Sequence, residues 1–250
     1  MGGLMNYSWD WLIFLQPSIT GEGAYGYLLL RGLLWTLAIS SLSWVLAVAI
    51  AAAVGIARTL DFVVLRFLAA TYVNIFRNIP LLVQLFLWYF VVPELLPTAW
   101  GTAIKRMDPL LNQYFTVVVG LTLYTAAKAS EHIRSGIESV SAGQKQAGRS
   151  LGLTTAQSYR YVILPQAMRI VIPPMTSDFL NVFKNSSVAL TIGLLELAGA
   201  TYQLSEFSAQ PFEFFAAATL IYMMITYTVI LLMRAVERCT RIAGSLGAAS

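Results

Sequence analysis

The sequence predicts an all-α integral membrane protein with about five transmembrane helices. Hydrophobic residues make up 58% of its 250 residues and charged residues only 11%, whereas soluble domains carry about 25% charged residues. The mean hydropathy is +0.69. The apolar residues come in long uncharged blocks, and about 20 such residues cover a hydrocarbon core of about 30 Å.

Five blocks are the candidate spans. Three of them carry no charge over their full length, namely residues 32–57, 109–127 and 214–233. A fourth block, residues 78–93, reaches spanning length only together with the preceding AATYVNIF. The fifth, residues 170–195, is interrupted by polar side chains.

The distribution of Lys and Arg predicts the orientation, because basic residues accumulate on the cytoplasmic side of spans. With the N-terminus outside and the C-terminus in the cytoplasm, twelve basic residues are cytoplasmic and three are external. The cytoplasmic set is Arg58, Arg66, Arg77, Lys128, Arg134, Lys145, Arg149, Arg160, Arg169, Arg234, Arg238 and Arg241. The external set is Arg31, Lys105 and Arg106, and Lys184 lies within a span. The net charge of +4 then follows from topology, and no nucleic-acid partner is needed.

The N-terminal segment lacks the basic start and the long apolar run of a cleavable signal peptide. We therefore expect it to stay attached. Trp9, Trp11 and Phe14, which flank Asp10, predict an aromatic anchor in the outer membrane interface.

No motif of a catalytic centre is visible. The chain has no phosphate-cradling loop, no HExxH or GxSxG motif and no cluster of His and Cys. Its single cysteine, Cys239, excludes an intrachain disulfide and a cysteine-built metal site. His132 is expected to be a solvated residue at the inner end of the third span. We expect no cofactor on this chain, so ATP and Mg would be bound by another polypeptide if transport is powered.

The polar segment 141–166 predicts two short helices. Ser141 with Gln144, and Thr154 with Gln157, have the spacing of capping boxes. In a capping box, a hydroxyl and an amide three residues later satisfy the free donors at a helix start.

A sharp turn is expected between these two helices. Gly152 fits the position after the first helix, which commonly needs a positive φ. Pro165 is expected to stop the second helix, because proline cannot continue the hydrogen-bond ladder. Ala147, Gly148 and Gly152 leave a face with little side-chain bulk, so another protein could approach closely.

A polar stripe within the fifth block is the first candidate for a solute path. Ionisable groups inside a membrane cost at least about 2.5 kcal/mol and usually mark a pathway or a pairing. Asp178, Asn181, Lys184 and Asn185 have the spacing of one helical face, and with Ser186 they are predicted to line the path. The run 185–187 is expected to weaken the helix. The alternative is that Lys184 and Asp178 merely pair or reach the interface.

A second polar group opens the fourth block. Pro80 removes a backbone donor and Asn78 can cap a helix, so we expect a kink or a helix start there. Gln84, one turn further in, either contacts solute or bonds to a neighbouring span. Arg77 is expected to be an interfacial anchor rather than a ligand.

The polar segment resembles the cytoplasmic EAA loop of ABC importer permeases. That motif reads EAA, three residues, Gly, nine residues, Ile, one residue, Leu-Pro. The matching residues here are Gln146, Ala147, Gly148, Gly152, Val162, Leu164 and Pro165. In the family this loop seats in a cleft on the ATPase subunit, so the resemblance implies that these residues couple the chain to an ATPase. Gln146 replaces the acid and Gly148 the second alanine, which leaves a fit by shape rather than by charge.

Other segments extend the resemblance over nearly the whole chain. YVNIFRNIPLLVQLF and IPPMTSDFLNVFKNSSVALTIGLLEL resemble the polar amino acid branch of ABC permeases. WDWLIFLQ and WYFVVPELLP are most similar to the glutamate/aspartate permeases of that branch. The resemblance implies one type I ABC importer permease domain over residues 1–250 in a bacterial inner membrane. It has an external segment 1–27, a helical core 28–240 and a cytoplasmic coupling loop 134–168.

The implied function is the uptake of polar amino acids, glutamate or aspartate, by alternating access driven by a separate ATPase subunit. The implied partners are a second permease subunit, identical or paralogous, an ATPase dimer, a periplasmic amino-acid-binding protein and the lipid bilayer. Related permeases for glutamine, histidine or arginine are an alternative, because they carry a similar Lys-Asn-Ser/Thr-Ser segment. A stand-alone secondary carrier would instead predict inverted repeats and a self-sufficient chain, and a membrane enzyme would need clustered catalytic groups.

Overall fold

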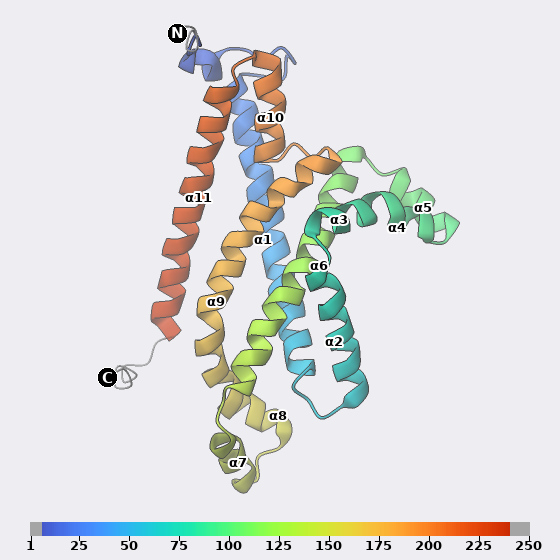
Figure 1. Ribbon diagram of the computed structural model, residues 1–250, viewed down its shortest axis with the longest axis vertical. Coiled ribbons are helices and arrows are strands. Elements are labelled where there is room, and N and C mark those ends of the chain that lie inside the picture. The colour runs from blue at the N-terminus through green and yellow to red at the C-terminus, as the bar shows by residue number, and fades with distance from the viewer. Residues whose placement is uncertain (1–6, 241–250) are drawn as a thin grey trace, which may run out of the picture. The chain divides into compact units, whose positions relative to one another are not determined.

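The computed structural model describes residues 7–240, and these are almost wholly helical (Figure 1). Among these residues, β-type pairing is confined to one isolated bridge between Pro17 and Ala24. The predicted all-α class is confirmed. Arg241 and residues 1–6 lie outside the described residues, as do the side chains of Lys145, Arg149 and Cys239.

Three described helices are long and apolar enough to cross a membrane, and the count rises to five if each of two bent helix pairs is one span. The three are α1 (Tyr25–Ala57), α6 (Pro109–Glu138) and α11 (Pro211–Thr240). They contain the three predicted uncharged blocks. The first bent pair runs from α2 (Val63–Asn78) into α3 (Leu81–Phe86), and the second runs from α9 (Leu164–Asn185) into α10 (Leu197–Ser208).

The fourth predicted block does not form one helix with the residues before it. Helix α2 ends at Asn78, and Ile79 is extended, with φ −90° and ψ 128°. A following proline favours this conformation, so the break predicted at Pro80 is confirmed. The side-chain amide of Asn78 donates to the Asn74 carbonyl at 2.7 Å, so this contact is made with the preceding helix and not with the following one. Beyond α3 the chain continues as a π-helical turn, Leu87–Val91, and the short helices α4 (Val92–Leu95) and α5 (Thr98–Lys105).

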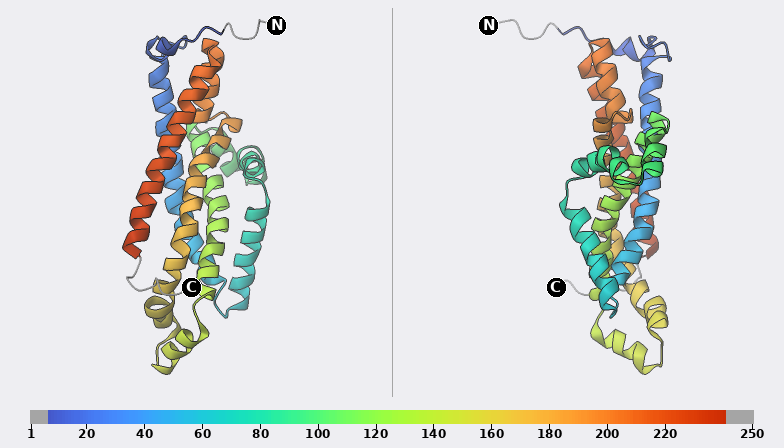
Figure 2. Two further views of the ribbon diagram at one scale, coloured as in Figure 1. Left: turned by 60° about the vertical axis from the view of Figure 1, so that its left-hand side comes forward. Right: turned by 90° about the vertical axis from the view of Figure 1, so that its right-hand side faces the viewer.

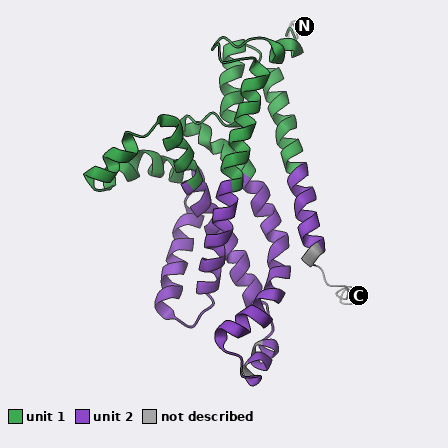
Figure 3. Cartoon of the chain, turned by 180° about the vertical axis from the view of Figure 1, so that it is seen from behind, with its two compact units in different colours: residues 1–41, 82–118, 183–226 green, residues 42–81, 119–182, 227–250 purple. Residues whose placement is uncertain are grey.

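The chain divides into two compact units, which are coloured separately in Figure 3. The described part of unit 1 is residues 7–41, 82–118 and 183–226, and that of unit 2 is residues 42–81, 119–182 and 227–240. Helices α1, α6 and α11 each contribute to both units. Figure 2 follows these helices in two further views.

Unit 1 is held together by a buried carboxylate. Glu196 is fully buried at the start of α10, where its Oε1 accepts a hydrogen bond from the Gly199 amide at 2.9 Å. Its Oε2 accepts from the Thr36 hydroxyl of α1 at 3.0 Å and the Tyr222 hydroxyl of α11 at 3.2 Å. One side chain therefore caps α10 and joins three helices of this unit.

Unit 2 has an apolar core between α1, α6 and α9. Its members are Ala47, Ala51, Ala126, Ala129, Ile133, Ile137, Val140, Ile163, Ala167, Val171 and Met175. Small residues allow membrane helices to approach closely. At Gly136 of α6, a Cβ would lie 2.4 Å from Cγ2 of Val171 in α9, so only glycine fits this crossing.

We expect Glu196→Ala to cause a clear decrease in the melting temperature of the protein purified in detergent. The change removes a helix cap and leaves Thr36 and Tyr222 without a buried acceptor, and each such loss costs about 1–3 kcal/mol. Glu206→Ala, which removes an exposed carboxylate from the same helix, is the matched control. Equal melting temperatures for the two variants would contradict this role of Glu196.

Candidate functional site

The hairpin, residues 141–165 of unit 2, contains the two predicted short helices. Helix α7 (Ala142–Ser150) ends in a Schellman motif. In this motif the Leu153 amide donates to the Gly148 carbonyl at 3.2 Å. Gly152 has φ +74°, and a Cβ there would meet no atom within 4 Å. The backbone conformation, and not lack of space, therefore requires glycine at this turn.

The second helix of the hairpin begins as predicted. Helix α8 (Thr155–Ser158) has a complete capping box, in which the Gln157 amide donates to the Thr154 hydroxyl at 3.3 Å. The Thr154 amide donates to Oε1 of Gln157 at 2.9 Å. At Ser141 the described contacts include only the hydroxyl half of the box, a bond of 3.4 Å from the Gln144 amide.

The prediction that Pro165 stops the second helix is wrong. Helix α8 continues through a π-helical turn, Tyr159–Ile163, into α9, and Pro165 is the second residue of α9. In the π turn, the Leu164 amide donates to the Tyr159 carbonyl five residues back. The π turn interrupts the regular i→i−4 hydrogen bonds just before Pro165. At this position the proline ring and its missing N–H would otherwise disturb those bonds.

The hairpin is fixed to the rest of unit 2. The Tyr159 hydroxyl donates to the Thr59 carbonyl at 3.2 Å and lies 3.0 Å from the Thr59 hydroxyl. Ile163 is buried in the apolar core of the unit. The two helices of the hairpin are also close to each other, because a Cβ at Gly148 would lie 2.9 Å from Oγ of Ser158. This contact gives a reason for glycine where the EAA motif has its second alanine.

The predicted coupling residues divide by exposure. Gln146, Ala147, Gly152 and Pro165 are exposed, Gly148 is buried, and Leu164 is half-buried against the core. The hairpin therefore exposes small residues at Ala147 and Gly152, where a partner can approach closely, next to the larger exposed side chains of Leu151, Arg160 and Tyr161.

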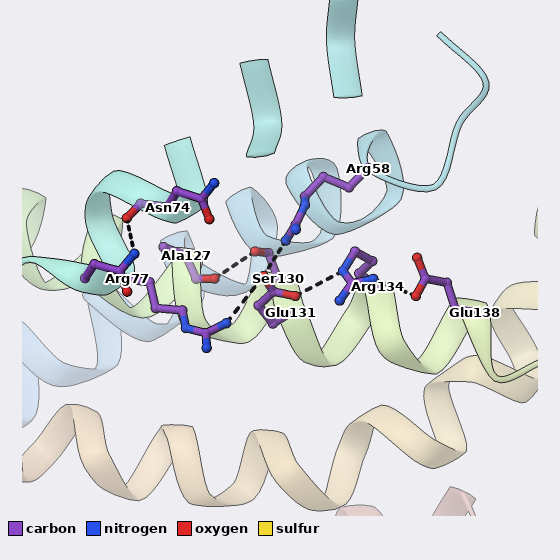
Figure 4. Close-up of polar contacts among 9 residues, drawn as sticks. Arg58, Asn74, Arg77, Ala127, Ser130, Glu131, Arg134 and Glu138 are labelled. Atoms are coloured by element: carbon purple, nitrogen blue, oxygen red, sulfur yellow. Dashed lines mark hydrogen bonds and ion pairs between the residues drawn. The ribbon is translucent and has the colours of Figure 1, made fainter. Parts of the chain in front are cut away.

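The Glu131 cluster is formed by Arg58, Arg77, Glu131, Arg134 and Glu138, and its residues come from α6, α2 and the end of α1 (Figure 4). Oε1 of Glu131 is 2.6 Å from Nη1 of Arg58 and 3.5 Å from Nη1 of Arg77, and Oε2 is 3.0 Å from Nε of Arg134. Arg134 also contacts Glu138 at 2.6 Å. The Glu131 side chain is only 18% exposed, so one partly buried carboxylate joins the ends of α1, α2 and α6.

Sequence reasoning missed Glu131. The spacing of Arg134 three residues after Glu131 and four before Glu138 is typical of paired charges on a helix and could have indicated part of the cluster. The contacts to Arg58 and Arg77 join distant parts of the chain. Arg77, which was expected to be an interfacial anchor, contributes to this cluster.

Part of the predicted polar stripe lies in unit 2. Asp178 is 7% exposed, and its Oδ2 lies 3.2 Å from Nε2 of His132 in α6. The His132 side chain is 37% exposed, in agreement with the expected solvation, and it also contacts the buried carboxylate of a neighbouring helix, which was not expected. Asn181 is half-buried, and the other predicted path residues of this unit, Asn78 and Pro80, are exposed.

The remaining predicted path residues belong to unit 1. Helix α9 ends at Asn185, and a 3-10 helix, Ser186–Ile192, follows, so the predicted weakening of the helix is confirmed. Lys184 is exposed in the last turn of α9, where a cation is favoured by the helix dipole. Ser186 is buried and donates to the Phe183 carbonyl at 2.8 Å, and Gln84 is 3% exposed. That these residues line one path stays a prediction.

No candidate metal-binding site is visible in the part of the chain that the structure describes. Across residues 7–240, no three His, Cys, Asp or Glu side chains are grouped so that they could hold an ion.

The sequence matches a known family over most of its length. The profile of the family described as "Binding-protein-dependent transport system inner membrane component" matches residues 45–242. The chain is 41% identical to the glutamate/aspartate import permease protein GltJ of Escherichia coli K12, over 97% of this chain and 99% of that protein. It is 30% identical to the glutamate/aspartate import permease protein GltK of Escherichia coli O157:H7, over 94% of this chain and 99% of that protein.

Solved structures share the fold. A chain of an amino acid ABC transporter crystallised with histidines has a TM-score of 0.71 and 27% identity, covering 86% of this chain and 94% of that one. A chain of the methionine ABC transporter MetNI, in an inward-facing conformation, also has a TM-score of 0.71, at 20% identity, covering 87% of this chain and 98% of that one.

We expect Glu131→Ala to destabilise the protein by at least about 1.5–3 kcal/mol, because one hydrogen bond to a charged group is worth about that much and Glu131 accepts such bonds from Arg58 and Arg134. Three arginines would lose their shared partner. The control is Glu138→Ala, which removes a carboxylate of 52% exposure that contacts Arg134. Denaturation in detergent monitored by circular dichroism measures both, and a loss from Glu138→Ala as large as that from Glu131→Ala would refute the central role of Glu131.

Proposed function

The chain belongs to the family of binding-protein-dependent transport system inner membrane components, and we propose that it is the permease subunit of an importer for glutamate and aspartate. Family membership makes it an inner-membrane transport subunit of the ABC type rather than an enzyme. The hairpin supports the proposed coupling role. It exposes Gln146, Ala147 and Gly152. It is fixed to the rest of unit 2 through Tyr159 and Ile163.

The proposed substrates follow from the similarity to GltJ, which extends over 97% of this chain. Lys184, exposed at the end of α9, supplies a cation that suits an acidic amino acid. The second candidate is another polar amino acid, and the 27% identity with a transporter crystallised with histidines favours it. The path proposed for either substrate includes Asp178, Asn181, Lys184, Asn185 and Ser186, together with Asn78, Pro80 and Gln84 of the second polar group.

The proposed assembly contains a second permease subunit, two copies of an ATPase that binds ATP and Mg, and an external amino-acid-binding protein. GltJ and GltK are two permease proteins named for the same import, and both resemble this chain, which supports a paralogous partner. We propose one transmembrane domain over residues 1–250, with segment 1–27 outside, a helical core 28–240, and the coupling loop 134–168 and the C-terminus in the cytoplasm.

In the proposed mechanism, closure of the ATPase pair moves the hairpin, and the hairpin moves the helices to which it is attached. The hairpin continues without a break into α9, because the π turn carries the helix past Pro165. On its other side, α6 leads into the hairpin, and the Glu131 cluster ties α6 to Arg58 and Arg77. Movement of the hairpin therefore reaches several helices together, as alternating access requires.

We expect proteoliposomes that contain the chain and its partners to accumulate glutamate and aspartate when ATP is enclosed with the ATPase. The measurement is uptake of radiolabelled amino acid with the binding protein added outside. Competition by excess unlabelled glutamate, but not by histidine or glutamine, is the expected result. Uptake driven only by histidine or glutamine would keep the importer and overturn the substrate, whereas uptake without any ATPase would support a secondary carrier.

Gly152→Glu is expected to abolish uptake while leaving insertion in the membrane intact. Glutamate at φ +74° is strained, and its charge would lie on the face proposed to contact the ATPase. Two controls separate these effects. Gly152→Asn keeps a residue that tolerates the left-handed conformation and should retain most uptake. Gly143→Glu places the same charge on α7 at a residue without positive φ. Normal uptake by Gly152→Glu would refute the coupling role of the hairpin.

A further inference from the structure

Unit 2 contains a cavity of about 310 Å³ beside the hairpin. It lies between the loop after α1, the first turn of α2, the end of α6 and helix α8, and residues from all four line it. Its volume is at the lower end of the range of about 300–1,000 Å³ for sites that take small ligands. A compact polar group would therefore fit it.

The cavity carries charges of both signs. Arg58 and Arg66 line it together with Asp61 and Glu138. Arg58 contacts Glu131 through Nη1, which leaves other donors of its guanidinium available. Glu138 contacts Arg134, whereas Asp61 and Arg66 have no ion-pair partner among the described residues. A ligand with one anionic and one cationic group would complement this lining.

The first turn of α2 offers backbone donors next to Arg66. Phe62, at the N-cap, makes no side-chain capping bond, and the first turn contains no acidic residue. Free amides at a helix start attract phosphate groups. On the same helix start, Phe62, Val63, Val64, Phe67 and Leu68 are each 59–68% exposed. Arg66, which lines the cavity, and these exposed apolar residues therefore lie at the same helix start.

We propose that this cavity binds the headgroup of a zwitterionic phospholipid that carries a primary ammonium, such as phosphatidylethanolamine. The phosphate contacts Arg66, Arg58 and the first turn of α2, and the ammonium contacts Asp61 and Glu138. The acyl chains cover the exposed apolar residues of α2. An anionic lipid without an ammonium would leave Asp61 without a cationic partner, whereas Glu138 already contacts Arg134. A bulky trimethylammonium has no N–H to donate to either carboxylate.

The test uses the whole transporter, with its partner subunits, in nanodiscs of equal parts phosphatidylethanolamine, phosphatidylglycerol and phosphatidylcholine. Native mass spectrometry measures the lipid retained. We expect phosphatidylethanolamine to be retained preferentially and Arg66→Ala to lower its retention about tenfold, the effect of losing one charged hydrogen bond. Arg169→Ala removes the same charge from an exposed position outside the cavity and should change nothing. Equal retention by the two variants overturns the proposal.

Two further variants keep the proposal falsifiable if Arg66→Ala fails to fold. Arg66→Gln removes the charge but keeps a long polar side chain, so it should fold normally and still retain less lipid. Asp61→Asn should weaken the preference for phosphatidylethanolamine over phosphatidylglycerol. Unchanged retention in both variants overturns the proposal.

The same assay distinguishes two alternative occupants of the cavity. Full displacement of the lipid by soluble glycerophosphoethanolamine would assign the cavity to a free headgroup and overturn the contribution of the apolar surface. Retention in the isolated permease, but not in the complete transporter, would assign the cavity to a segment of the ATPase and overturn the lipid site.

Discussion

The contact between Arg58 and Glu131, 2.6 Å long, is the constraint on which the geometry of unit 2 depends. It joins the end of α1 to α6 a few residues before the hairpin begins. Both side chains are less than one-fifth exposed, so the pair is screened by water far less than a surface ion pair. Without it, α6 would still be held by Ile133 and Ile137 of the apolar core and by the contact of His132 with Asp178, but the segment that leads into the hairpin would lose its tie to α1.

The hairpin itself is specified mostly by local chemistry. Gly152 provides the left-handed turn, and Thr154 and Gln157 start the second helix. These features lie within six residues, so the sequence alone predicts them. The lining of the adjacent cavity depends on the same turn, because Leu153 and Ser158 face it from the two sides of the capping box.

Most of the fold could be predicted from the sequence, and the failures have two causes, contacts between distant segments and a local π turn. The uncharged blocks 32–57, 109–127 and 214–233 form helices because membrane insertion selects for length and hydrophobicity alone. The Glu131 cluster and the pair of His132 with Asp178 depend on contacts between distant segments, 73 residues apart for Arg58 and Glu131. Pro165 was misjudged because a π turn, which has no clear sequence signal, carries the helix past it. The contribution of the polar side chains of α9 to a solute path also depends on contacts between segments that are far apart in the sequence.

The central claim is that the outer face of the hairpin contacts the ATPase. A cysteine at Ala147, introduced with Cys239→Ser, should form a cross-link to the ATPase subunit in the assembled transporter on addition of a short bifunctional thiol and amine reagent. A cysteine at Lys105, in α5, is the control in the same background. The account predicts a cross-link from Ala147 alone, formed to a degree that changes when ATP is added. No cross-link from Ala147, or an equal one from Lys105, would contradict it.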